Sequence, residues 1–161
     1  MKTLHLPLFI ALAAAATLTS CDKDKEAAKP KTRTELLTGK DWIMTAETVS
    51  PAIRTDDGSL ITDLFAVKPS YDRDDLMRFS KPDIYQLDEG ATKKAPNFPQ
   101  VNPGTWSFSE GEKVLNTKLQ GQTVGNSFNI LELTDNTLKV SGQETDDDGK
   151  VYTVTFTFAK H

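Results

Sequence analysis

Residues 150–158 read Lys-Val-Tyr-Thr-Val-Thr-Phe-Thr-Phe, and this stretch decides the fold class. Its large apolar side chains fall at every second position, with valine or threonine between them. Alternation with a period of two predicts a β-strand that has one buried face and one wetter face. The Asp147-Asp148-Gly149 sequence just before it is typical of a tight turn, so we expect this strand to form a hairpin with the preceding one.

Seven further segments upstream carry the same strand signals and are separated by turn-forming residues. Eight strands that follow one another through hairpins close most simply into a barrel, which leaves no exposed edge. We therefore expect an all-β fold, an eight-stranded antiparallel up-and-down barrel, with a two-sheet β-sandwich as the alternative. The seven upstream segments are residues 41–49, 75–79, 84–87, 105–109, 113–118, 127–133 and 137–142.

Some stretches of the domain depart from this regular pattern. In residues 127–133 the apolar phase changes after Ile130, which predicts either a β-bulge or burial on both faces. Residues 34–39 predict one helical turn with a threonine cap and a glycine stop. Residues 50–73 do not fit the strand pattern, although 63–66 is compatible with one helical turn. Residues 90–104 contain three prolines and predict a loop.

The N-terminus predicts export and lipidation. Lys2 is followed by an apolar run at 6–18, which is the length of a signal-peptide core and too short to span a bilayer. The run ends in Leu18-Thr19-Ser20-Cys21, which resembles the bacterial lipobox, and Cys21 is the only cysteine of the chain. We therefore expect residues 1–20 to be a lipoprotein signal peptide, with Cys21 acylated and attached to the membrane. Residues 21–33 are predicted to be a disordered tether, and residues 34–161 the barrel domain.

Composition excludes several classes of function. The net charge of −4 and the four scattered arginines give no basic surface for a nucleic acid. His5 lies in the signal peptide and His161 is the final residue, so the predicted barrel has no internal histidine or cysteine. Histidine-assisted nucleophiles and histidine zinc sites are therefore excluded, and no phosphate-binding glycine loop is present. We expect a monomeric, non-enzymatic protein with no cofactor and no metal.

Acidic side chains offer the one weak alternative. Asp72, Asp74 and Asp75 form a dense cluster, next to Asp88 and Glu89 if the second and third strands pair. A surface Ca²⁺ ion is one interpretation of this cluster, and a solvated acidic loop is the favoured one. Residues 144–149 mimic the opening of a calcium loop, but the twelfth position would be a threonine inside the last strand, so we expect a polar hairpin tip.

Several short motifs follow one another along the domain: Leu36-Leu37-Thr38-Gly39-Lys40-Asp41-Trp42, Asp63-Leu64-Phe65-Ala66, Asp74-Asp75, Glu89-Gly90-Ala91-Thr92 and Gly104-Thr105-Trp106. Together they resemble the lipocalin-like domain lipoproteins of Gram-negative gut and oral bacteria. The resemblance spans about residues 35–158. It implies that Trp42 plugs the barrel floor and that the lipid anchor lies in the outer membrane. Lipocalins have Gly-x-Trp where this chain has Gly39-x-x-Trp42, and no arginine follows the last strand to cover the tryptophan.

The large apolar side chains lead to two functional hypotheses. In the first, the barrel mouth binds a small apolar ligand. In the second, the barrel is packed solid and its loops, such as 50–73 or 90–104, bind an envelope protein or an inhibitor target. Because most predicted inward residues are large and few are polar, we expect a narrow or closed interior. Candidate ligand-binding residues are Trp42, Met44, Phe79, Trp106, Phe108 and Phe156.

Overall fold

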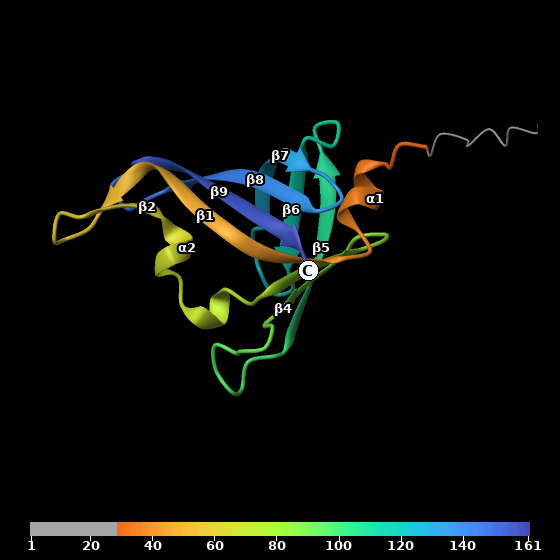
Figure 1. The fold of residues 1–161 in the computed structure, drawn as a ribbon, viewed down its shortest axis with the longest axis horizontal. Helices are drawn as coiled ribbons and strands as arrows, with labels where there is room; N and C mark the ends of the chain where they lie inside the picture. The colour runs from red at the N-terminus through yellow and green to blue at the C-terminus, as the bar shows by residue number, and fades with distance from the viewer. Residues whose placement is uncertain (1–28) are drawn as a thin grey trace, which may run out of the picture. The chain divides into compact units, whose positions relative to one another are not determined.

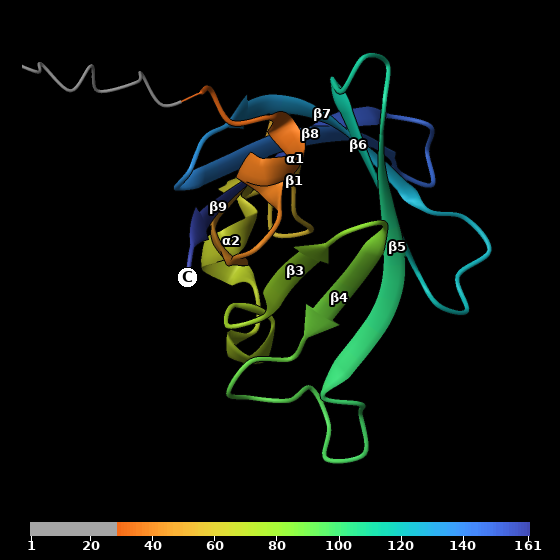
Figure 2. The same ribbon diagram turned by 90° about the vertical axis from the view of Figure 1, so that its right-hand side faces the viewer.

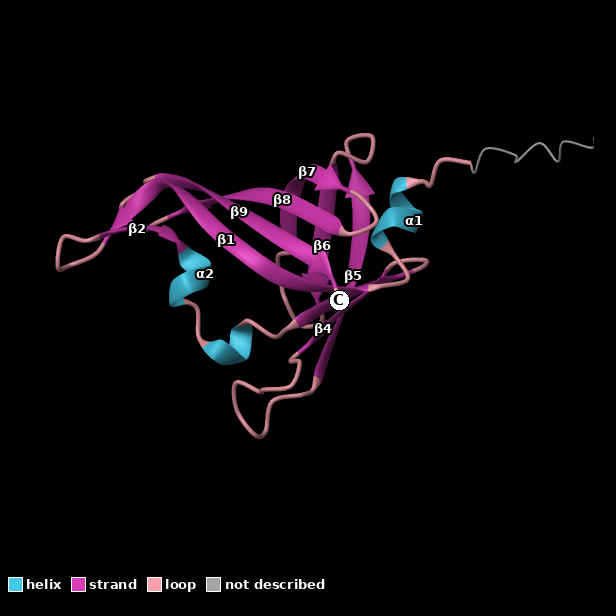
Figure 3. Cartoon of the chain, viewed as in Figure 1, coloured by secondary structure: helices cyan, strands magenta, loops and turns pink. Residues whose placement is uncertain are grey.

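The computed structural model describes residues 29–161, which form a closed β-barrel. Antiparallel pairing runs from β1 through β3, β4, β5, β6, β7, β8 and β9, and pairing of β9 with β1 closes the ring (Figures 1 and 3). The predicted eight-stranded up-and-down barrel is confirmed, and the β-sandwich alternative is wrong. The strands of the ring are β1 Asp41–Arg54, β3 Leu76–Ser80, β4 Ile84–Asp88, β5 Val101–Ser109, β6 Val114–Leu119, β7 Asn126–Leu133, β8 Thr137–Thr145 and β9 Val151–Lys160.

Two stretches that were expected to be irregular contain strand. β1 continues past Val49 to Arg54 and pairs there with an additional strand, β2 Leu60–Asp63. Pro51 obscured this extension, because proline cannot donate to a ladder; it lies where the β1–β2 register is irregular and just beyond the last β1–β9 pair. β5 likewise begins at Val101 and includes Pro103, whose carbonyl accepts a hydrogen bond from Gln120 N at 2.8 Å.

The bulge predicted near Ile130 is present. Ile130 pairs with Val140 and Glu132 pairs with Lys139, so Leu131 is the extra residue and its side chain is exposed. Because of this extra residue, the side chain of Leu133 points inward and packs, like that of Ile130, against the core.

A short helix and a tryptophan close one end of the barrel, which we call the floor. The helix α1 Arg33–Leu37 begins one residue before the expected domain start and is capped by Thr32, not Thr34, in a reciprocal capping box with Glu35. Trp42 has no solvent-exposed surface, and its Nε1 donates to the Leu37 carbonyl at 2.9 Å. The predicted burial of Trp42 at the barrel base is therefore confirmed.

The core follows the inward faces of the strands. One contiguous cluster joins residues near the floor, including Leu37, Trp42 and Phe79, to residues higher in the barrel. Gly104 is required where β5 approaches β6, because a Cβ atom there would lie 2.3 Å from the Lys118 carbonyl oxygen.

The barrel is least tightly closed between β1 and β3. Only three residue pairs connect these strands, from Asp41↔Arg78 to Ile43↔Leu76, and β1 then turns away to pair with β2. Arg78 braces this seam, with Nε 2.8 Å from Asp41 and Nη1 2.6 Å from Asp88. The connection from β2 to β3, which contains α2 Leu64–Val67 and the 3-10 turn Ser70–Asp72, lies beside the end of the seam where β3 begins (Figure 2).

Candidate functional site

The barrel encloses a cavity of about 370 Å³. Its base consists of Phe79, Leu115, Leu138 and Phe158, all of which belong to the buried core above Trp42. This volume lies within the usual range for small-molecule sites. Of the narrow or closed interior that was expected, the fully closed form is not present: the inward side chains are large, but those around the middle of the barrel leave this space between them.

The side walls of the cavity are apolar and adaptable. Two methionines, Met44 on β1 and Met77 on β3, face it, and methionine side chains adjust easily to the shape of a ligand. Aromatic rings from separate strands support the walls, since Phe128 and Phe156 meet edge to face with centroids 5.6 Å apart. The remaining apolar wall residues are Tyr85, Leu87 and Val140.

The six predicted ligand-binding residues separate into two groups. Met44, Phe79 and Phe156 line the cavity. Trp42, Trp106 and Phe108 do not line it; they pack beneath or beside it as part of the core and its margin. Trp106 is fixed there by a 2.9 Å hydrogen bond from its Nε1 to the Ser80 carbonyl and by an edge contact with Phe79.

Polar groups gather at the open end of the cavity, which we call the mouth. Lys68, Asp72 and Asp75 come from the β2–β3 connection, and Thr117 and Asn126 come from a cross-strand pair of β6 and β7. Sequence reasoning did not identify these residues as cavity-lining ones. Asp72 and Asp75 appeared only as an acidic cluster, and nothing local to Lys68 or Asn126 indicates that tertiary folding brings them to a cavity.

The mouth residues are held by a dense set of local contacts. Asp63 caps α2 by accepting from Ala66 N, as expected for the helical turn predicted at 63–66. Arg73 donates through Nε to the Lys68 carbonyl at 2.8 Å and through Nη2 to the Ala66 carbonyl at 3.0 Å, which fixes the chain around Lys68. Lys68 Nζ in turn lies 2.8 Å from Oε2 of Glu47, a mostly buried carboxylate on β1.

The loop after β4 holds Asp74, and therefore its neighbour Asp75, in place. Thr92 donates to the Asp74 carboxylate through its backbone N and its Oγ1, both at 2.8 Å. Gly90 packs so closely on the Asp74 backbone that a Cβ would lie 2.1 Å from the Asp74 carbonyl oxygen. The predicted proximity of this acidic cluster to Glu89 is confirmed, because β3 and β4 pair.

Asp75 is the electrostatically unusual group of the site. Burial, together with the negative charges of Glu89, Asp72 and Asp74, raises the pKa of its carboxyl to about 6 although Lys68 opposes the shift. Its Oδ1 atom is buried and accepts no hydrogen bond from residues 29–161. Burial, reinforced by the charge of Asp75, likewise raises the pKa of Tyr85 to about 12. The carboxyl group of Asp75 and the phenol of Tyr85 therefore both line the cavity, and burial disfavours the charged form of each.

The acidic cluster is not arranged as a metal site. Within residues 29–161 no three histidine, cysteine or carboxylate side chains converge in a way that would hold a metal ion. Asp74 instead binds Thr92, while Asp72 and Asp75 face the cavity. The described part of the chain also contains no helix with the length and apolar character of a membrane span.

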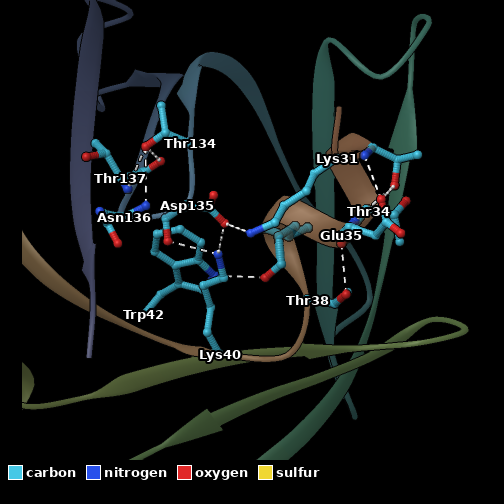
Figure 4. A network of polar contacts seen from close by, with 12 residues as sticks. Lys31, Thr34, Glu35, Thr38, Lys40, Trp42, Thr134, Asp135, Asn136 and Thr137 are labelled. Carbon is cyan, nitrogen blue, oxygen red and sulfur yellow. Dashed lines mark hydrogen bonds and ion pairs between the residues drawn. The ribbon is translucent and has the colours of Figure 1, made fainter. Parts of the chain in front are cut away.

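A second polar cluster lies at the floor, where its contacts hold neighbouring parts of the chain together (Figure 4). Asp135 pairs with Lys31 and lies 3.5 Å from Lys40 Nζ, which also donates to the Asp135 carbonyl at 2.9 Å. Lys40 Nζ lies 5.2 Å from the centroid of a Trp42 ring. Lys40 thus places a cation beside the Trp42 ring and connects the start of β1 to the β7–β8 hairpin.

No protein-family model matches this chain, and no curated protein is significantly similar to it. The resemblance to lipocalin-like lipoproteins, and the family's outer-membrane location, therefore stay predictions. Cys21 and the signal peptide lie outside the described residues.

Proposed function

We propose that this protein is a lipid-anchored binding protein of the bacterial cell envelope, which holds a small, largely apolar ligand inside its barrel and performs no catalysis. The observation that carries the proposal is the cavity of about 370 Å³, with an apolar base and walls and a few polar groups at one end. Ligand sites typically combine an apolar lining with a few placed polar groups. The solid barrel of the alternative hypothesis would have no such space.

The anchor belongs to the same proposal. Acylation of Cys21, supported by the Leu18-Thr19-Ser20-Cys21 motif, would attach the protein to the outer membrane. A tether of residues 22–30 would then let the barrel meet ligand near the membrane surface, either in the periplasm or outside the cell, since Lys31, Thr32 and Arg33 belong to the barrel floor.

The decisive experiment is a titration with N-phenyl-1-naphthylamine, a neutral dye whose fluorescence increases in apolar cavities. A fragment spanning residues 29–161 suits this assay, because it contains every strand pairing and core residue of the described part of the chain. We expect saturable one-to-one binding. Met44→Trp should abolish it by filling the cavity from the wall, because the indole is much larger than the methionine side chain.

Leu131→Trp provides the matched control, since it adds the same indole to the exposed bulge outside the barrel. Circular dichroism of each variant verifies folding. If the wild-type fragment shows no saturable dye binding, or if Met44→Trp and Leu131→Trp bind equally well, the cavity is not a ligand site. The loops would then be the functional surface, as in the alternative hypothesis of a protein-interaction or inhibitor module.

A further inference from the structure

The cavity is polarised along the barrel axis. Its base residues Leu138 and Phe158 pair with each other where β8 begins and β9 ends, next to the floor. Its polar residues lie at the opposite end, the mouth. Asp75 directly precedes the first residue of β3, and Asn126 is the first residue of β7. A ligand that satisfies both ends is therefore amphipathic, with its apolar part toward the floor and a polar head at the mouth.

The ionisable groups of the mouth have a negative balance. Lys68 contributes the one positive charge among the cavity-lining residues, and Glu47 neutralises it at 2.8 Å. Asp72 and Asp75 remain, and Glu89 and Asp74 add negative potential at Asp75. An anionic head would meet like charges here, whereas a cationic head would meet opposite ones.

Asp75 also has an unused acceptor. Its Oδ1 is buried without a donor from the described residues, and a buried oxygen in this state gains free energy when a donor reaches it. An ammonium group carries three donors and one positive charge, so it matches both the empty acceptor and the local potential.

We propose that the ligand is a cationic amphiphile, whose protonated amine binds Asp75 and Asp72 at the mouth and whose hydrocarbon tail extends between Met44, Met77 and Phe156 toward Phe158. This inference rests on the proposed function, since it assigns the chemical class of the ligand for the same cavity. The Lys68–Glu47 pair keeps Lys68 from attracting a carboxylate in the amine's place.

Isothermal titration calorimetry of the 29–161 fragment separates the head from the tail. Octylamine, octanol and octanoate share one tail and differ in the charge of the head. At pH 7.5 we expect octylamine to bind at least about tenfold more tightly than octanoate, with octanol between them. Within the amine series, each added methylene from hexylamine to octylamine should tighten binding about fourfold, because it buries more apolar surface.

A variant and its control test the role of Asp75 directly. Asp75→Asn should weaken octylamine binding about tenfold and leave octanol binding nearly unchanged. Asp147→Asn removes the same charge at the exposed tip of the β8–β9 hairpin and should change neither. In the wild type, lowering the pH from 7.5 to 5 should weaken octylamine binding but not octanol binding, because the Asp75 carboxyl becomes protonated. The charged and titratable groups around this carboxyl are Lys68, Asp72, Asp74, Glu89 and Tyr85.

The outcomes distinguish this inference from the function beneath it. Equal binding of the three heads, or tightest binding of octanoate, would overturn the cationic ligand and leave an apolar binding site in place. An unchanged octylamine affinity in a folded Asp75→Asn variant would also overturn it. If none of the three octyl compounds binds and the amine series shows no dependence on tail length, the proposed binding function itself fails.

Discussion

Replacement of Asp75 by asparagine should stabilise this protein at neutral pH, although the residue lines its candidate ligand site. The folded state raises the pKa of Asp75 from the ordinary 3.8 to about 6, because the carboxyl is partly buried among other negative charges. Between these two values the folded chain binds more protons than the unfolded chain. Stability from this group is therefore present below about pH 4 and is lost as the pH rises through about 6.

The pKa of about 6 sets the magnitude of the effect. The difference from the ordinary value corresponds to roughly 3 kcal/mol for a fully buried group. Asp75 is partly exposed at the mouth, so solvent screening reduces the expected cost of its charge to about 1–2 kcal/mol. Asparagine has nearly the same shape and no charge, so Asp75→Asn should raise the free energy of unfolding at pH 7.5 by about that amount.

Urea titrations of the 29–161 fragment, followed by tryptophan fluorescence, measure this difference. At pH 7.5 the midpoint should rise in Asp75→Asn, and at pH 4 most of the gain should disappear while the slope of the transition stays unchanged. Asp147→Asn should show neither effect. A variant that is no more stable than wild type at pH 7.5, or one whose gain persists undiminished at pH 4, would refute the argument. If Asp75→Asn is more stable than wild type but binds octylamine more weakly, the Asp75 carboxylate lowers stability and contributes to ligand binding.

Two further predictions concern the floor and the anchor. Trp42→Ala should lower the free energy of unfolding by about 3–5 kcal/mol, because it removes a fully buried ring and leaves the Leu37 carbonyl without its donor. A loss under about 1 kcal/mol in a urea titration would contradict the role of Trp42 as the barrel plug. Cys21→Ala in the full chain should prevent acylation, so that the protein no longer partitions with membranes into detergent; partitioning like wild type would remove the lipid anchor from the proposal.

The sequence determined the barrel because strand periodicity and turn chemistry are local properties. Alternation in residues 151–158 and the phase change after Ile130 are both visible along the chain, and the structure has the strand and the bulge where they were expected. Burial of Trp42 followed from a short motif that brings a helical turn next to the first strand. Where a proline interrupted the local pattern, at Pro51 and Pro103, strand ends were misplaced, since neighbouring strands decide whether a residue without an N–H group is tolerated.

Only the tertiary structure decided what the interior contains. A list of inward residues gives their volumes but not the radius at which opposing strands hold them, so the cavity between Met44, Phe128 and Phe156 was invisible in one dimension. Its polar mouth was hidden for the same reason. Lys68 meets Glu47 only because the β2–β3 connection folds over the weak seam between β1 and β3. Charge at a site depends on distances in space, and the spacing of residues along the chain does not set those distances.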